Sequence, residues 1–545
     1  MNRFATLALS LLIGLGTLSA ADRQESPESW YQQGRQNILD AESRKPNNRK
    51  AKNVILFVGD GMGISTVTAA RIMEGQMRGE TGEENFLFFE TFPHSALSKT
   101  YNTNQQTPDS AGTMTAMMTG VKTKAGFISV NQNILRGDAE GTQGNELVTL
   151  LEKAEIARKS TGIVSTARLT HATPACTYAH VPERGWESNA ALPENSPVQD
   201  IAAQLIDFPK NWAARGYPQV DGPEVAIGGG RGSFFPQGPI PAKYTSEGGN
   251  GSRTDGRNLA DEWLDTRRNS AFIHDLSTFN KIDANKTEYL FGLFEKSHMQ
   301  FTADLEDQER EEPTLSEMTE LAIDILDNNR KGFFLLVEGG RIDHAHHAGN
   351  AYRALRDAVE FSKAVETAYN NTDPGETLIV VTADHSHVMT MAGYPTRGNS
   401  IVGLVAGNGK DGEPNNKFMT DIMGKPYTTL GYTIGAGYTG ASPDQPEGPK
   451  AYPHSPKQYK NITQARPDLA EHLHVTPESQ TNESFKDHLQ ETSIPAGSET
   501  HGGEDVGIWA TGPKAHLLGG TVEQHVIFHL MDYAFGFERI DPFKE

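Results

Sequence analysis

The sequence contains little cysteine and far more negative than positive charge. Its 545 residues include one cysteine, Cys176, which excludes an internal disulfide and a cysteine-based zinc ribbon. Lysine and arginine total 49 against 70 acidic residues, which gives a net charge of −21. Because nucleic-acid backbones and anionic membrane surfaces repel such a chain, we expect no specific nucleic-acid binding and no default membrane partner.

Long apolar runs are absent beyond the first residues. Arg3 precedes an almost wholly apolar stretch over residues 4–18, and residues 19–21 are small. This order is typical of a secretory signal peptide, and the run is shorter than the roughly 20 residues that span a membrane. We expect residues 1–21 to be removed on export. The mature protein is then periplasmic or secreted and has no transmembrane anchor. An uncleaved N-terminal anchor is the alternative.

The rest of the chain alternates short apolar runs with helical periodicity. The apolar runs, rich in β-branched residues, lie at 54–58, 161–165, 333–337, 378–381 and 506–510. Runs of this kind suit strands that are buried on both faces of a parallel sheet. A capping box at Thr314 predicts a helix to about Leu326, and residues 351–369 have helical spacing. We predict an α/β fold with a central, mostly parallel sheet between helices.

The composition also divides the chain. Residues 22–51 form a polar segment that we expect to be a loose lead-in. A catalytic α/β core is predicted over 52–398 and again over 499–545. Between them, residues 399–498 are rich in glycine, proline, asparagine, glutamine and histidine, which predicts a loop-rich insertion. The acidic run at 304–312 is interpreted as a solvated face.

Acidic and histidine side chains concentrate where the predicted strands end. Asp60 lies inside a glycine-rich loop directly after the first strand. Such a loop can cradle a dinucleotide, but a carboxylate at its centre would repel a pyrophosphate. A metal ligand is the better interpretation, and an ordinary turn aspartate is the alternative.

A second group follows the strand at 333–337. Glu338 comes first, and Asp343 and His347 are four residues apart, so they share a helix face. Mixed aspartate and histidine ligation suits zinc, whereas a glutamate with hydroxyl and water ligands suits magnesium. His346, in the same segment, is left unassigned.

Two further segments supply the same residue types. Asp384 and His385 end the strand at 378–381, and His387 is interpreted as a neighbour only. His501 lies in a T-H-G-G-E-D segment and is the candidate to complete a site that already holds Asp343.

Ser110 and Arg184 are candidates for binding an oxyanion. Ser110 precedes an apolar helical stretch, and free N–H groups at a helix N-terminus favour an anion. No G-x-S-x-G elbow surrounds it, so a nearby metal is the expected activator rather than a histidine base. The planar guanidinium of Arg184 could grip a phosphate. An N-cap serine and a surface arginine are the alternatives.

Six segments, taken in this order, resemble the alkaline phosphatase family, and the resemblance runs from about Asn53 to Phe535. The family implies a central sheet between helices, two zinc ions and one magnesium ion per subunit, and a phosphoserine intermediate. The segments are DGMG (60–63), PDSAGT (108–113), THATPACTYAH (170–180), FFLLVEGGRIDHAHH (333–347), VVTADHSH (380–387) and ETHGGEDV (499–506).

The resemblance also assigns roles to residues. Positions that match the ligands of the first zinc ion are Asp343, His347 and His501. Those that match the second zinc ion are Asp60, Asp384 and His385. Those that match the magnesium site are Asp60, Thr173 and Glu338. Ser110 matches the nucleophile and Arg184 the phosphate-binding arginine. His171 and His344 are expected around the magnesium site and the bound phosphate, and whether they touch a metal stays open.

A calcium site known from animal members is predicted to be absent. Phe294, Glu295 and Glu312 align with three of its ligands, but Lys243 stands where the family has an acid. An ammonium cannot ligate calcium, and we expect it to neutralise the glutamates. The insertion at 399–498 occupies the place of a crown-like dimer element, so a homodimer is expected by analogy.

The resulting prediction is metal-dependent hydrolysis of small phosphate monoesters that releases inorganic phosphate and an alcohol. A sibling phosphodiesterase or sulfatase of the same superfamily is the main alternative, and Glu338 with Arg184 argues for monoesters. Two other functions are alternatives. One is an exported zinc- or phosphate-binding protein without activity, and the other is a dinucleotide-binding oxidoreductase.

Overall fold

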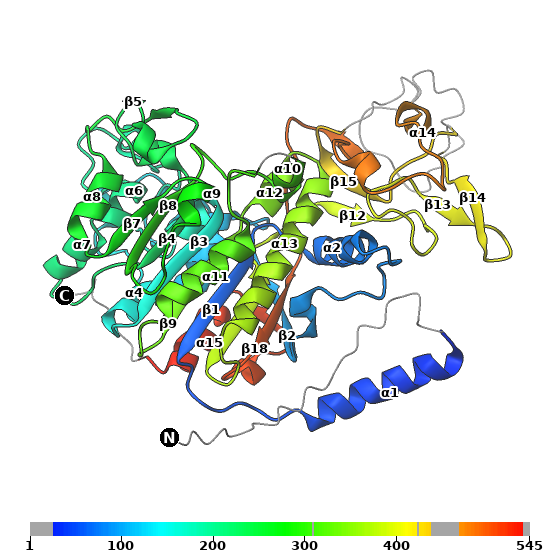
Figure 1. The fold of residues 1–545 in the computed structure, drawn as a ribbon, viewed down its shortest axis with the longest axis horizontal. Coiled ribbons are helices and arrows are strands. Elements are labelled where there is room, and N and C mark those ends of the chain that lie inside the picture. Colours follow the sequence, from blue (N-terminus) through cyan, green and yellow to red (C-terminus); the bar gives the residue numbers. More distant parts are fainter. Residues whose placement is uncertain (1–24, 308–309, 422–423, 438–467, 538–545) are drawn as a thin grey trace, which may run out of the picture.

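The central element is a 10-stranded sheet that runs through the whole body of the protein (Figure 1). The computed structural model describes residues 25–307, 310–421, 424–437 and 468–537. In spatial order the strands are β19 (Thr521–Glu523), β2 (His94–Lys99), β18 (Val506–Thr511), β10 (Thr377–Ala383), β1 (Asn53–Gly59), β9 (Phe333–Gly339), β3 (Ser160–Arg168), β4 (Val225–Gly229), β8 (Tyr289–Leu293) and β7 (Ser270–Ile273).

The predicted parallel core is confirmed. β1 pairs in parallel with β10 on one side and β9 on the other, and every residue of these three strands is buried. Side chains of β1 alternate between two hydrophobic clusters: Val54 and Leu56 face one, and Ile55 and Phe57 face the other. Burial on both faces explains why the sequence shows a continuous apolar run here.

One predicted strand runs against the others. β18 pairs antiparallel with β10 and with β2, so it is inserted between strands made from much earlier parts of the chain. Its apolar run predicts a strand but carries no signal for direction. The sheet is mostly parallel, as expected, with an antiparallel strand next to its centre.

Helices cover both faces of the sheet. Figure 1 shows α11 (Leu315–Leu326) and α13 (Ala351–Asn370) crossing one face, and α2 (Ile64–Met77) belongs to the same hydrophobic cluster. The capping box at Thr314 opens α11 as predicted. The helices of the opposite cluster are α3 (Ser110–Thr119), α4 (Leu150–Ile156), α5 (Ala172–Ala175), α6 (Ile201–Ile206), α7 (Phe208–Ala214), α8 (Leu259–Thr266) and α15 (Val526–Phe535).

Shorter elements complete the core. They are α9 (Leu276–Phe279), α10 (Thr302–Asp307), α12 (Arg341–His347), and the two-stranded pairs β5 (Gly238–Pro239) with β6 (Asn250–Gly251) and β11 (Ser386–His387) with β17 (His501–Gly502). In the acidic run, the prediction of a solvated face is wrong for Glu312, which is buried.

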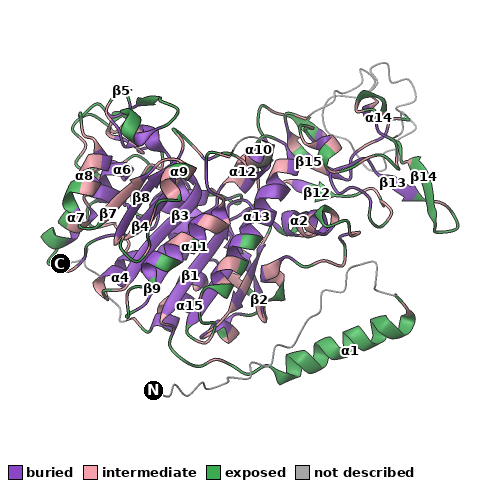
Figure 2. Cartoon of the chain, in the orientation of Figure 1, coloured by how far each residue is buried: buried purple, intermediate pink, exposed green. Residues whose placement is uncertain are grey.

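The segment expected as a loose lead-in contains a helix, α1 (Pro27–Ser43). Ser26 caps it in a capping box and Pro27 stands at its first turn, which are both start signals for a helix. None of its residues is buried, and Figure 2 shows it exposed along its whole length. Residues 1–24, which include the predicted signal peptide, lie outside the described residues.

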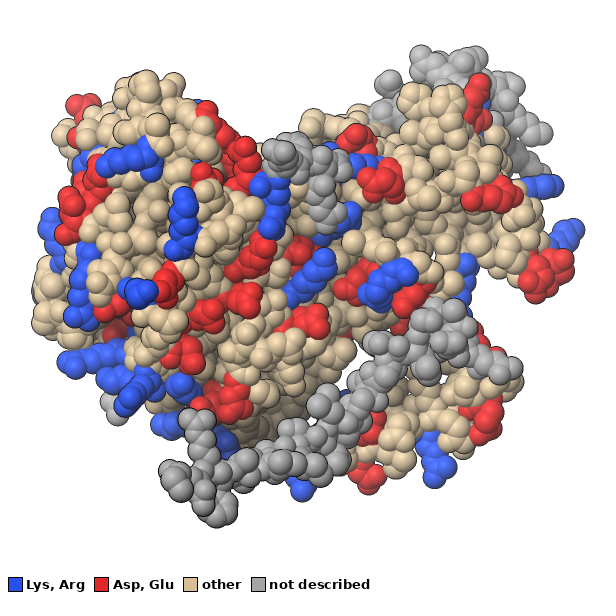
Figure 3. Space-filling view, in the orientation of Figure 1, with Lys and Arg blue, Asp and Glu red and all other residues tan. Residues whose placement is uncertain are grey.

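The insertion at 399–498 has little regular structure where it is described. β15 (Leu430–Gly435) and β16 (Thr492–Pro495) join β12 (Met389–Met391) in a small sheet. A hairpin of β13 (Ala406–Asn408) and β14 (Pro414–Phe418) and the short α14 (Leu469–His472) accompany it. In the described part of the chain no helix has the length and apolar character needed to cross a membrane. On the face seen in Figure 3, acidic and basic side chains are interspersed.

Candidate active site

Acidic and histidine side chains converge at the carboxyl ends of three neighbouring strands. The parallel register places Gly59, the last residue of β1, beside Ala383 of β10 and Gly339 of β9. Residues that follow these strands therefore meet at one edge of the sheet. Among the described residues, three groups hold their ligand atoms within 4.8 Å of one another. The first cluster is Asp343, His347, His387 and His501, the second is Asp60, Asp384 and His385, and the third is Asp60, His171 and Glu338.

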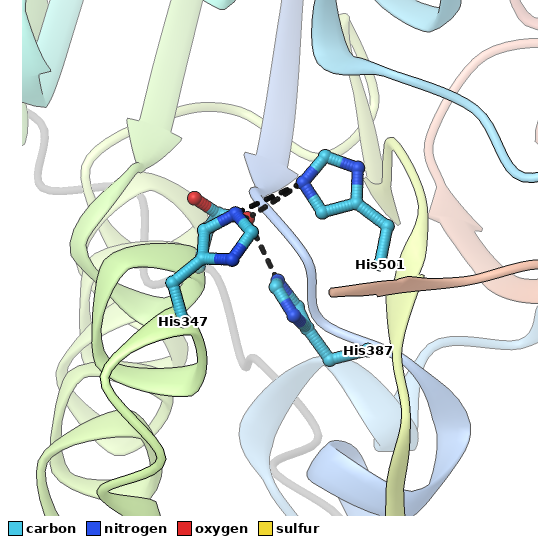
Figure 4. A group of neighbouring side chains, drawn as sticks. His347, His387 and His501 are labelled. Atoms are coloured by element: carbon cyan, nitrogen blue, oxygen red, sulfur yellow. Dashed lines mark hydrogen bonds and ion pairs between the residues drawn. The ribbon is translucent and has the colours of Figure 1, made fainter. Parts of the chain in front are cut away.

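In the first cluster, two imidazole nitrogens face each other across a short gap. α12 places Asp343 and His347 one turn apart, and β17 brings in His501. The Nε2 atoms of His347 and His501 lie 3.1 Å apart, and each is 3.4 Å from Oδ1 of Asp343. Figure 4 shows the rings of His347, His387 and His501 converging on one point.

Backbone carbonyls determine which nitrogen carries hydrogen in two of these rings. Nδ1 of His347 donates to the carbonyl oxygen of Glu499 at 2.8 Å, and Nδ1 of His501 donates to that of Pro108 at 2.8 Å. In the neutral rings both Nε2 atoms then present lone pairs. Two lone pairs and a carboxylate at these distances repel one another unless a cation lies among them, so the first cluster fits a metal such as zinc.

His387 has a different role from the other two histidines. Its Nε2 lies 2.7 Å from Oδ1 of Asp343, and its Nδ1 lies 2.5 Å from Oε2 of Glu499. Burial alone would lower the pKa of His387, but the two carboxylates outweigh it and raise the pKa to about 10. Both ring nitrogens therefore donate, and the ring holds Asp343 in place instead of ligating a metal.

The second cluster lies against Ser110. Nε2 of His385 is 3.4 Å from Oδ1 of Asp60 and 3.3 Å from Oδ2 of Asp384. The Ser110 hydroxyl oxygen is 3.2 Å from the same Nε2 atom. Gly61 lets the loop after β1 lie against the first cluster, because its φ is +70° and a Cβ there would lie 2.4 Å from the His387 ring.

The third cluster contains buried oxygens that have no partner. Both carboxylate oxygens of Asp60, Oε1 of Glu338 and the Thr173 hydroxyl lack a hydrogen-bond partner among the described residues. Burial raises the pKa of Asp60 well above its ordinary value, and the nearby carboxylates raise it further. Burial likewise raises the pKa of Glu338 to about 8. Orphaned oxygens in a dry site are what a hard cation such as magnesium would satisfy.

Ser110 is the first residue of α3, so the predicted position at a helix N-terminus is confirmed. The N-cap is Asp109, whose Oδ1 accepts from the backbone N–H of Gly112, so Ser110 is free of that role. The other oxygen of Asp109 accepts from Nη1 of Arg184 at 3.2 Å. The structure therefore brings Ser110 and Arg184 together, which their separation in the sequence does not show.

His171 and His344 lie on the other side of Arg184. Nη2 of Arg184 donates to Nε2 of His171 at 3.0 Å, so Nδ1 carries the hydrogen in the neutral ring. That buried Nδ1 has no partner among the described residues and can donate to an oxygen in the third cluster. The ring centres of His171 and His344 are 5.5 Å apart. His346, left unassigned above, is bonded to Thr66 and Tyr432.

Three residues of the site escaped sequence reasoning. Glu499 binds His387 through its side chain and His347 through its carbonyl. Ser165 donates to Oε2 of Glu338, and Asp109 holds Arg184. Asp109 and Glu499 each lie within a segment that resembles the family, next to Ser110 and two residues before His501. Their closeness in sequence to these candidates was the signal that could have identified them. Ser165 stands in an apolar strand and gave none.

These observations define a protein of the α/β class with three residue groups that could hold metal ions beside a serine. Comparisons agree. The family model described as alkaline phosphatase matches residues 51–537. An alkaline phosphatase of Gadus morhua is 41% identical over 520 residues, which cover 94% of this chain and 98% of that protein. The tissue-nonspecific isozyme of Homo sapiens is 40% identical over 536 residues, covering 96% and 92%.

Solved structures show the same fold. The alkaline phosphatase of Thermus thermophilus has a TM-score of 0.59 at 21% identity, covering 92% of this chain and 94% of that one. That of the Antarctic bacterium TAB5 has a TM-score of 0.55 at 19% identity, covering 90% and 100%. The chain belongs to the alkaline phosphatase family, and its activity is the metal-dependent hydrolysis of phosphate monoesters.

Proposed function

We propose that Ser110 is the nucleophile of this phosphatase and that Arg184 binds the substrate phosphate. The observation that carries the proposal is the position of the Ser110 hydroxyl, 3.2 Å from Nε2 of His385 at the start of α3. Its oxygen forms a bond to phosphorus while the bond to the leaving alcohol breaks. Water then attacks the phosphoserine, which releases inorganic phosphate and restores the hydroxyl.

The proposed ions are two zinc and one magnesium per subunit. Asp343, His347 and His501 would hold one zinc ion. Asp60, Asp384 and His385 would hold the other. Asp60, Thr173 and Glu338 would hold magnesium, with His171 beside it. When bound, these ions supply positive charge that stabilises oxyanions and lowers the pKa of nearby hydroxyl groups. The opposed lone pairs of the first cluster and the orphaned oxygens of the third support this assignment.

The chain's own groups orient the phosphate. Asp109 and His171 hold the guanidinium of Arg184 from two sides, so its fork is fixed before substrate arrives. The N-terminus of α3 adds a partial positive charge beside Ser110. His344 lies next to His171 and is proposed to line the phosphate pocket. Because recognition falls on the phosphate group, we expect many small monoesters to be substrates.

We also propose that no calcium binds near Phe294. The expectation that Lys243 neutralises the glutamates is wrong, because its ammonium bonds to Asp261. A different cation lies on the Phe294 carbonyl: the buried guanidinium of Arg231 donates to that oxygen at 2.8 Å and faces Glu247 at 3.9 Å. A guanidinium on that carbonyl supports the proposal, and calcium content of the purified protein tests it.

We also propose that the protein forms a homodimer and that it is exported. α1 exposes Trp30 and Tyr31, 52% and 68% accessible, and buries none of its residues. An unpacked helix with exposed aromatic side chains supports burial against a second copy. Light scattering should give the mass of two chains, and deletion of residues 22–43 should lower it.

Sequencing of the mature N-terminus tests cleavage after residues 1–21.

The decisive experiment is hydrolysis of p-nitrophenyl phosphate by metal-loaded protein. The Ser110→Ala variant should keep its metals and lose activity by a factor on the order of a thousand or more. The matched control is Ser277→Ala on α9, which should retain full activity. An acid quench should find phosphate on the peptide that carries Ser110. Full activity of Ser110→Ala, or phosphate on a different residue, would contradict the nucleophile assignment.

The same preparation tests the alternative. Bis-p-nitrophenyl phosphate and p-nitrophenyl sulfate probe the diesterase and sulfatase activities of the superfamily. We expect both to turn over far more slowly than the monoester, because each is a monoanion, whereas Arg184 and the proposed ions match the two negative charges of a phosphate monoester. A higher rate with either would favour the sibling hydrolase.

A further inference from the structure

His298 lies beside the proposed phosphate pocket but has no part in the assignment above. It stands in the loop that follows β8, and that loop is fixed at both ends by backbone hydrogen bonds. Gly230 donates to the carbonyl of Glu295 at 3.1 Å, and Met299 donates to that of Thr166 at 3.0 Å. Gly229 permits the close approach, since a Cβ there would lie 2.1 Å from the carbonyl oxygen of Ser297. The position of His298 is therefore set by the backbone.

The His298 ring packs directly on His344. Their ring centres are 3.8 Å apart, with 49° between the planes, and the ring centre of His171 is 5.5 Å from that of His298. Nδ1 of His344 is buried and has no hydrogen-bond partner among the described residues. No hydrogen bond at Nδ1 orients the His344 ring, so the close contact with His298 is one constraint on its rotation.

The opposite edge of His298 is held by Arg168. Nη1 of Arg168 lies 2.5 Å from Nε2 of His298. The same guanidinium forks onto Glu187, with Nε and Nη2 at 2.8 and 2.7 Å from its carboxylate oxygens, and Thr170 donates to Glu187 at 2.5 Å. A guanidinium only donates, so the His298 ring must accept and is neutral. Its contribution is therefore packing and hydrogen bonding rather than charge.

We propose that His298 is a positioning residue for phosphate binding and that it acts through His344. The inference rests on the proposed function, in which His344 lines the phosphate pocket. Arg168, which Glu187 holds, contacts one edge of the His298 ring, and the face of that ring packs on His344. Without His298, the His344 ring gains space to turn away from the pocket.

The test compares three substitutions in metal-loaded enzyme. His298→Ala should raise both KM for p-nitrophenyl phosphate and Ki for inorganic phosphate by about three- to tenfold, which corresponds to the loss of one neutral hydrogen bond between His344 and phosphate. The value of kcat should change less than about twofold. His298→Phe keeps a ring against His344 and should restore wild-type values. His298→Asn keeps an acceptor for Arg168 without the ring and should stay defective. If His298→Asn rescues and His298→Phe does not, the packing role is wrong.

A double-mutant cycle asks whether the effect passes through His344. His344→Ala should raise the same Ki, and adding His298→Ala should cause little further change. Independent, additive effects would overturn the proposal. Metal content and melting temperature, measured for every variant, exclude loss of ions or of fold, and His516→Ala is the remote histidine control.

The outcomes separate this proposal from the proposed function. If the wild-type protein does not hydrolyse monoesters, the function fails. If the wild-type protein is active and His298→Ala has wild-type KM and Ki, only the positioning role fails.

Discussion

Two groups of buried acids stand at opposite ends of the same sheet, and they differ in how their oxygens are satisfied. The active-site group lies at the carboxyl ends of β1, β9 and β10. The other group, the buried Glu155 with the half-buried Glu224, lies at the amino ends of β3 and β4. Both groups contain carboxylates that burial makes costly to ionise, so acidity and burial alone do not distinguish them.

At the amino end, the protein itself satisfies the carboxylates. Glu155 accepts from the Thr161 hydroxyl at 2.6 Å and from the backbone N–H of Gly222 at 3.1 Å. Glu224 accepts from the Ser160 hydroxyl at 2.8 Å and from the backbone N–H of Thr161 at 2.7 Å. No oxygen of these two side chains is left for a ligand.

At the carboxyl end, the oxygens of Asp60 and one oxygen of Glu338 have no such partner within the described part of the chain. A buried orphan oxygen costs on the order of 1–3 kcal/mol, more when it is charged. Between these two groups, the unsatisfied oxygens rather than burial distinguish the one that is proposed to hold cations.

The largest expected effect comes from exchanging one acid in each group for its amide. Asp60→Asn should lower kcat/KM on the order of a thousandfold or more and lower the metal content, because Asp60 belongs to both the second and third clusters. Glu155→Gln, the matched control, should keep activity within about threefold. Equal losses in the two variants would erase the distinction between the groups.

Chelation should change the pH dependence of stability. In metal-free protein the raised pKa values of Asp60 and Glu338 mean that the folded state binds protons that the unfolded state releases. Stability then falls as pH rises from the ordinary carboxyl range to about 8. Between pH 5 and 8, the free energy of unfolding should fall by roughly 1–3 kcal/mol more in chelated protein than in metal-loaded protein. Parallel melting curves would contradict the assignment.

Glu155 in the amino-end group should also make stability fall as pH rises, and this effect should not depend on metal. Burial raises the pKa of Glu155 to about 8, so wild-type protein loses stability between its ordinary carboxyl range and that pH. Glu155→Gln cannot ionise and keeps an oxygen for Gly222. The free energy of unfolding of the variant, compared with that of wild type, should be roughly 1–2 kcal/mol more favourable to the folded state at pH 9 than at pH 5. Denaturant melts at both pH values check this, and a constant difference would contradict it.

The smallest effect is expected at Tyr289. Its hydroxyl donates to Oδ2 of Asp221 at 2.7 Å next to Glu224, but Asp221 is exposed and water can replace the bond. Tyr289→Phe should cost about 0.5–1 kcal/mol in denaturant unfolding and leave activity unchanged. A loss of activity would mean that the two ends of the sheet are coupled.

Sequence alone predicted the elements whose pattern is local. The apolar run before Asp60 and the capping box at Thr314 each gave a correct element. β8 was missed because Gly292 interrupts its run, and packing explains that glycine: a Cβ there would lie 2.9 Å from the Ile273 side chain. α1 was missed because a polar helix without a buried face has no apolar periodicity.

The candidate site was predictable in membership but not in geometry. Strand-end acids and histidines, with the family resemblance, named the acids and most of the histidines that meet in the three clusters, whereas His387 was interpreted as a neighbour only. The sequence could not show that Asp109 and His171 hold Arg184, because these contacts join separate loops. Nor could it show that His387 is saturated by two carboxylates, since Glu499 is more than a hundred residues away.

The place of β18 in the sheet has a consequence for biosynthesis. β2 is translated about four hundred residues before β18, yet β18 lies between it and β10. Until the ribosome has released residues 506–511, β10 and β2 both present open edges to the surrounding solution. His501 emerges just before them. The first cluster is therefore complete only when almost the whole polypeptide exists, and we expect premature termination anywhere upstream to yield a chain without activity.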